Sequence, residues 1–108
     1  MGRPHRSVLS FGLIGMRHLS TVRDRFEITG IGCALVPGMS ETWPKNLPIR
    51  RGDSIELRRP DGTSLWTRIQ SVEICDRIGG HSEIAILLPP EIEKTEVPVG
   101  TEIWREDP

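Results

Sequence analysis

Apolar and polar residues alternate in short runs along the chain, and glycine or proline separates most of these runs. The first clear runs, residues 26–28 and 33–35, lie on either side of Gly30 and Gly32. A period of two is typical of a β-strand with one buried face. A pair of glycines inside such a pattern usually marks a bulge or the corner of a barrel. The pattern therefore predicts one strand that bends sharply at the two glycines.

The strongest local pattern predicts a β-hairpin over residues 49–69. Two alternating runs, residues 55–58 and 65–69, flank the turn sequence Pro60-Asp61-Gly62. Alternating runs around a tight turn are typical of two paired antiparallel strands. The apolar positions change phase at residues 70–71, which predicts a bulge that bends the strand there.

The C-terminal half predicts two more strands. Residues 83–88 are apolar on both faces, as in a buried central strand. Residues 97–104 include Pro98, which cannot donate a hydrogen bond, so we expect an edge strand there. No helical period extends beyond a turn or two. These patterns predict an all-β fold, a small closed β-barrel of about six strands.

The 108-residue chain is long enough for a single domain with one core, which we assign to residues 23–108. Residues 1–22 begin with basic residues and continue into a short apolar run that serine and glycine interrupt. That run is too short for a membrane span and lacks the cleavage site of a signal peptide. We therefore expect a disordered or mis-assigned N-terminal extension, with Met16 as an alternative start.

The segment 37–48 is rich in turn-forming residues and has no periodicity, so we expect a loop. It contains Trp43, which the pattern does not place on a strand. Two interpretations stay open for this residue. Trp43 either folds back as a lid on one end of the core, which we favour, or stands exposed as a binding anchor.

Charge is distributed unevenly, although the net charge is only −1 at pH 7. Residues 1–25 contain five arginines and one acidic residue, and residues 45–68 contain six cations and three acidic residues. After residue 69, acidic residues outnumber cations nine to three. We expect a dipolar molecule, with one face that attracts polyanions and one that repels them.

The residue types that carry catalysis or hold cofactors do not occur here at useful spacings. Gly30-x-Gly32 lacks the third glycine and the helix of a dinucleotide site, and no phosphate-binding loop motif is present. Neither the three histidines nor Cys33 and Cys75 have the spacing of metal ligands. Both cysteines lie in apolar runs, so we expect buried reduced thiols and a cytoplasmic protein. We predict no enzyme activity, cofactor, metal, nucleotide or membrane binding.

Several short motifs follow one another in a set order over residues 25–104. They are Phe26-x-Ile28-x-Gly30-x-Gly32, Gly38, Ile49-x-x-Gly52-Asp53-x-Ile55-Glu56, Thr67-x-Ile69-x-Ser71-Val72-Glu73, Ala85-Ile86-Leu87-Leu88 and Val97-x-Val99-Gly100. In this order and spacing the motifs resemble the second domain of elongation factor Tu and related translational GTPases. The resemblance implies a barrel that contacts tRNA or ribosomal RNA, here without the GTPase domain. The loops around Pro37 and after Ile74 depart from the family pattern, so no aminoacyl-binding residue is carried over.

The candidate site lies on the predicted hairpin and the segment before it. Five arginines can line a strip there, with Trp66 available for base stacking: Arg50, Arg51, Arg58, Arg59 and Arg68. The same arginines also fit a solvated face that balances the acidic C-terminal half. In that case Trp43, Trp66 or the acidic end would contact another protein. We predict a noncatalytic binding module whose partner is tRNA or ribosomal RNA or, alternatively, a protein.

Overall fold

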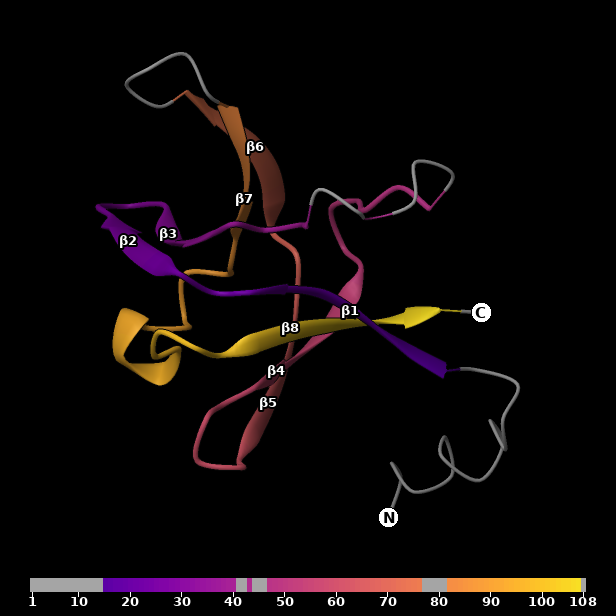
Figure 1. Cartoon of the computed structure of the whole chain (residues 1–108). Helices are drawn as coiled ribbons and strands as arrows, with labels where there is room; N and C mark the ends of the chain where they lie inside the picture. The colour runs from indigo at the N-terminus through magenta and orange to yellow at the C-terminus, as the bar shows by residue number, and fades with distance from the viewer. Residues whose placement is uncertain (1–14, 41–42, 44–46, 77–81, 108) are drawn as a thin grey trace.

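The computed structural model describes residues 15–40, 43, 47–76 and 82–107. These residues form eight strands and one short 3₁₀ helix, and they contain no α-helix (Figure 1). In chain order the elements are β1 (Gly15–Thr21), β2 (Asp24–Ile28), β3 (Gly32–Val36), β4 (Ser54–Arg58), β5 (Ser64–Arg68), β6 (Ser71–Asp76), β7 (Ser82–Leu87), η1 (Lys94–Glu96) and β8 (Glu102–Asp107). The predicted all-β class is therefore confirmed.

The strands form two four-stranded antiparallel sheets, ordered β1-β8-β4-β5 and β2-β3-β7-β6. The chain passes between the sheets where β5 leads into β6. The amide of Ile69 donates to the carbonyl oxygen of Asp53, directly before β4 of the first sheet, and the next amide, that of Gln70, donates to Leu87 O of β7 in the second sheet. The bend predicted at residues 70–71 is thus the crossing from one sheet to the other.

Three details of the predicted architecture are wrong. The described residues contain eight strands rather than six, and their pairing gives two sheets rather than one closed barrel. The two glycines do not bend one strand but reverse the chain between β2 and β3, and the amide of Ile31 donates to Ile28 O in the turn. Gly30 and Gly32 have φ angles of 77° and 140°, and only glycine adopts these easily. Alternation alone does not separate a bent strand from a tight hairpin.

The N-terminal segment corrects the predicted extension. Residues 15–21 form β1, which pairs with β8, while Leu19 and Val22 are fully buried. Residues 1–14 lie outside the described residues. Because β1 covers one side of β8 and β4 covers the other, β8 is a central strand, not the predicted edge strand. Pro98 lies in the turn before β8, where its carbonyl accepts from Thr101.

The main core lies between the sheets. Its members come from both, and the largest fully buried side chains include Leu19, Leu35, Ile55, Leu57, Ile69, Ile86, Leu88 and Ile103. Strand β7 lies between β3 and β6 and buries Ala85, Ile86 and Leu87, which confirms the buried central strand predicted for this segment. The outward face of the β1-β8-β4-β5 sheet remains available to carry a site.

Candidate binding site

Three of the predicted site residues share the outward face of the β4–β5 hairpin. Ile55 and Leu57 point into the core, so the intervening residues of β4 point outward. In the pairing register, Trp66 lies opposite Glu56 and Arg68 lies opposite Ser54. Trp66 is 51% exposed. The structure therefore places Arg58, Trp66 and Arg68 on one face, as the period-two pattern predicts.

Arg58 is already engaged on this face. Its guanidinium carbon lies 4.1 Å from the centre of the Trp104 ring, and its Nε donates to Glu56 Oε1 at 2.9 Å. His18 is a second aromatic neighbour of Trp104, and the two ring centres lie 5.2 Å apart. A paired and stacked arginine has less capacity for a phosphate than a free one.

Arg59 lies at the far end of the hairpin and has a structural role. Its Nε donates to Glu96 O at 2.7 Å and its Nη1 donates to Thr63 Oγ1 at 3.1 Å. These bonds tie the β4–β5 turn to η1. Arg59 is therefore separated from Arg50 and Arg51 by the length of β4.

Trp43 is the lid of the core and not an exposed anchor. Its side chain is 8% exposed, and its indole nitrogen donates to the carbonyl oxygen of Leu47. The guanidinium groups of Arg105 and Arg17 lie 5.2 and 5.8 Å from the ring centre. The favoured interpretation of Trp43 holds, and its indole supports two arginines at this end of the sheet.

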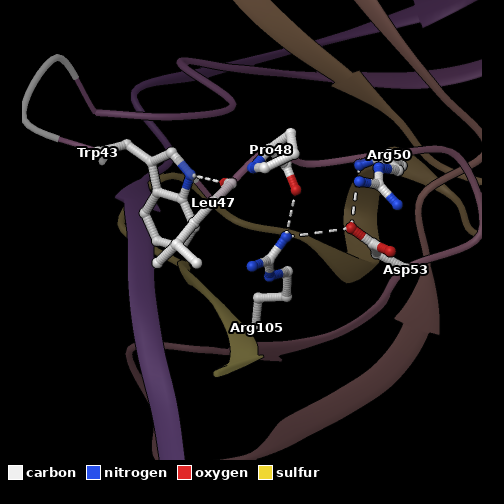
Figure 2. A network of polar contacts seen from close by, with 6 residues as sticks. All are labelled: Trp43, Leu47, Pro48, Arg50, Asp53 and Arg105. Carbon is white, nitrogen blue, oxygen red and sulfur yellow. Dashed lines mark hydrogen bonds and ion pairs between the residues drawn. The ribbon is translucent and has the colours of Figure 1, made fainter. Parts of the chain in front are cut away.

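Next to Trp43 is a shallow cleft, which we call the Asp53 cleft. It has a volume of about 450 Å³ and is lined by Leu47, Pro48, Arg50, Gly52, Asp53, Ser54, Arg105 and Glu106. Arg105 Nη1 donates to Pro48 O at 2.7 Å and to Asp53 Oδ2 at 3.2 Å (Figure 2). The backbone amide of Arg50 donates to the same Asp53 oxygen at 2.9 Å. These bonds fix the Asp53 carboxylate in the wall of the cleft.

Positive charge gathers around this cleft. Arg17 pairs with Arg105 across β1 and β8, Arg68 pairs with cleft residue Ser54, and Arg50 and Arg51 belong to the turn before β4. We call this group, Arg17, Arg50, Arg51, Arg68 and Arg105, the cationic end. Among the described residues, the acidic ones that line the cleft are Asp53 and Glu106. Within the described chain, the guanidinium groups of Arg50, Arg51 and Arg68 have no hydrogen bond or ion pair.

Acidic residues gather near η1, at the end of the sheet where the β4–β5 turn lies. Glu91, Glu93 and Glu96 surround Lys94 there, and the backbone amide of Lys94 donates to Glu27 Oε1. Arg59 reaches this region through Glu96 O. The acidic residues near η1 and the cationic end thus lie at opposite ends of β4, although Arg105 and Glu106 of the acidic C-terminal half lie at the cationic end and Arg59 lies near η1.

The predicted last strand ends at residue 104, so the pattern does not identify Arg105 as a site residue, and it gives Trp104 no role beyond that strand. In the structure β8 continues to Asp107. Its alternation provides the missing signal, since Ile103 and Arg105 lie on one face while Trp104 lies on the other. Extending the period of two by one residue identifies Arg105 as an inward-facing cation at the rim of the core.

Two titratable groups among the described residues have a pKa shifted from its ordinary value. Burial raises the pKa of the Cys33 thiol, which has no exposed surface and forms no disulfide. This agrees with the expected buried reduced thiol, while the Cys75 side chain lies outside what the structure describes. Hydrogen bonds from Thr63 lower the pKa of Asp61 in the β4–β5 turn. Neither group belongs to the cationic end.

No group of three or more histidine, cysteine or acidic residues is arranged to hold a metal ion in the described part of the chain. No helix among the described residues is long and apolar enough to cross a membrane. No family model matches the sequence, and comparisons with curated proteins and with solved structures gave no match. The geometry of the cationic end and the motif resemblance are therefore what a functional assignment rests on.

Proposed function

We propose that this protein is a noncatalytic module that binds single-stranded RNA at the cationic end, with Trp66 as a stacking platform. The observation that carries the proposal is the gathering of five arginines from separate segments, three of them unpaired within the described chain, close to an exposed tryptophan. Unpaired arginines attract phosphates, and an open indole face accepts an unstacked base. A base within a duplex is not available for such stacking, so the ligand is single-stranded.

The resemblance to the second domain of elongation factor Tu supports the same proposal. It favours an arrangement of the two sheets like that in domain 2 of translation factors. It also favours tRNA or ribosomal RNA as the source of the single strand, and a cytoplasmic location for the protein. The arginines that bind are Arg50, Arg51 and Arg68. Arg58 shapes the face through Trp104, and Arg59 and Trp43 support the structure around it.

The test is fluorescence anisotropy with a labelled oligouridylate of about twelve nucleotides, measured between about 50 and 200 mM salt. Replacing Arg51 or Arg68 with alanine should reduce the steepness of log K against log salt by about 0.7 each. Lys94→Ala, an exposed cation at η1, is the matched control and should leave the slope unchanged.

Trp66→Ala tests the stacking contribution and should weaken binding by about tenfold. Phe26→Ala removes an exposed aromatic side chain from the other sheet and should have no effect. Binding of a duplex of the same length as tight as that of the single strand would contradict the role of Trp66.

A second function, protein binding, is favoured by a separate feature. The β2–β3 hairpin exposes three apolar side chains, Phe26, Ile28 and Ile31. Apolar side chains clustered on a surface are typical of contact sites. If this function holds, a partner protein retained after ribonuclease treatment should be lost with Ile31→Ser and kept with Arg68→Ala.

A further inference from the structure

The Asp53 cleft differs in chemistry from the arginines around it. Its lining residues include two arginines, Arg50 and Arg105, and two acidic residues, Asp53 and Glu106. A phosphate presents only acceptors and negative charge, so the two carboxylates disfavour it inside the cleft. A nucleobase presents donors and acceptors together, which matches a mixed lining.

The polar groups of the cleft are partly used and partly open. Asp53 Oδ2 accepts from the Arg50 amide and from Arg105, whereas Asp53 Oδ1 has no hydrogen bond within the described chain. The same is true of the Arg50 guanidinium and the Ser54 hydroxyl. Figure 2 shows the Arg50 side chain beside the Asp53 carboxylate. The cleft therefore offers a donor fork next to a fixed acceptor.

The carboxylate is held in place before any ligand arrives. Arg105 binds both Pro48 O and Asp53, and its guanidinium is supported by the Trp43 ring. The Arg105 side chain is only 12% exposed, so it is not free to swing away. Such preorganisation reduces the ordering that binding would otherwise require. The volume of about 450 Å³ lies within the range of small-molecule sites.

We propose that the Asp53 cleft holds one guanine base of the bound RNA, an inference that rests on the proposed function. The Arg50 guanidinium donates to guanine O6 and N7, the pairing that arginine makes with guanine in nucleic-acid recognition. Asp53 Oδ1 accepts from the N1 and N2 hydrogens, and the Ser54 hydroxyl lies beside them. Arg51 and Arg68 hold the neighbouring phosphates outside the cleft.

Other bases fit this arrangement less well. Uracil has one ring N–H between two carbonyl oxygens, and these oxygens would face the Asp53 carboxylate. Adenine lacks O6 and a hydrogen on N1, so it loses half of the arginine pairing and the main donor to the carboxylate. Cytosine can offer its adjacent N3 and O2 acceptors to the arginine fork, but it then presents a single amino group to the carboxylate where guanine presents both an N1–H and an N2 amino group.

The experiment compares four labelled oligonucleotides by anisotropy, namely oligouridylate and the same strand with one central guanosine, adenosine or cytidine. We expect the guanosine strand to bind at least about fivefold tighter than oligouridylate. Arg50→Met keeps the backbone amide that donates to Asp53 but removes the guanidinium, so this preference should fall to about one. Asp53→Asn, which removes the charged acceptor, should reduce it as well.

Arg51→Met is the matched control, because Arg51 lies in the same turn outside the lining of the cleft. It should weaken all four strands equally and keep the guanosine preference. Wild-type binding without any preference for guanosine would overturn the cleft proposal and leave the proposed function standing. Equal loss of the preference in Arg50→Met and Arg51→Met would also overturn it, and absence of binding to all four strands would overturn both proposals.

Discussion

Replacing Trp43 with alanine should destabilise the fold strongly, whereas the same change at Trp66 should not. Trp43 is 8% exposed and donates its indole N–H to Leu47 O, and its ring centre lies 5.8 and 5.2 Å from the guanidinium groups of Arg17 and Arg105. Trp66 is 51% exposed on the outer face of β5. The pair therefore separates a tryptophan that supports the structure from one that is available to a ligand.

The magnitude follows from the environment of each ring. Truncation of a buried tryptophan to alanine costs about 3–5 kcal/mol, and the Trp43 ring lies at the rim of the core next to a loop, so we expect about 3 kcal/mol. Each arginine stacked on the ring accounts for about 0.5–1 kcal/mol of this loss. An exposed residue with no described partner changes the free energy of unfolding by at most about 0.5 kcal/mol, which is the expectation for Trp66→Ala.

The assay is urea unfolding followed by far-ultraviolet circular dichroism, because each variant removes one of the fluorophores. The midpoint should fall for Trp43→Ala with an unchanged dependence on urea, and both variants should keep the wild-type spectrum in water. A free energy of unfolding for Trp43→Ala within about 1 kcal/mol of that for Trp66→Ala would refute the assignment of Trp43 as the lid of the core.

Three further predictions concern the fold. Gly32→Ala should lower the free energy of unfolding in urea by about 3 kcal/mol or more, because the residue has a φ of 140° and the added Cβ would lie 2.6 Å from a backbone carbonyl oxygen. Gly30→Ala places its Cβ in open space and should lower it by only about 1–2 kcal/mol, the cost of the positive φ. In a Cys75→Ser variant, Cys33 should resist a thiol reagent in the native protein and react in denaturant, because burial removes access and raises its pKa. Hydrogen bonds from Thr63 lower the pKa of Asp61 below its usual 3.8, so the ionised form of Asp61 stabilises the folded state. This contribution should be complete above about pH 5 and should disappear as the pH falls through the lowered pKa. Urea unfolding measured at a series of pH values should show this loss of stability in the wild type and not in Asp61→Asn. Rapid labelling of native Cys33, or equal costs for the two glycine variants, would contradict these expectations.

Local sequence was sufficient where the structure depends on neighbours in the chain. The β4–β5 hairpin follows from alternation and from the turn Pro60-Asp61-Gly62, in which Asp61 accepts from Thr63. The shared face of Arg58, Trp66 and Arg68 follows from the same period. The change of phase of the apolar positions at residues 70–71 predicts the bend after Ile69. It does not predict that this bend carries the chain from one sheet to the other.

Elements that depend on distant partners were not predictable in this way. Strand β1 contains few apolar residues and becomes a strand by pairing with β8, more than eighty residues later. Arg59 donates to the carbonyl oxygen of Glu96, 37 residues away, so the sequence around Arg59 does not show that it lies apart from the other arginines. The position of Arg105 against Trp43 depends on how the loop folds over the sheet. The sequence therefore predicts the part of the candidate site that lies on the outward face of the β4–β5 hairpin. It does not predict the part formed where the loop that contains Trp43 meets the sheet.

The most direct test of the binding face is to record the indole N–H signals of the three tryptophans by nuclear magnetic resonance while oligouridylate is added. The account predicts a large shift for Trp66, which is exposed beside Arg68, and little change for Trp43, whose indole donates within the core. Trp66→Ala assigns the signal and should remove the shift. A spectrum in which the Trp66 signal stays in place while RNA binds would contradict the proposed face.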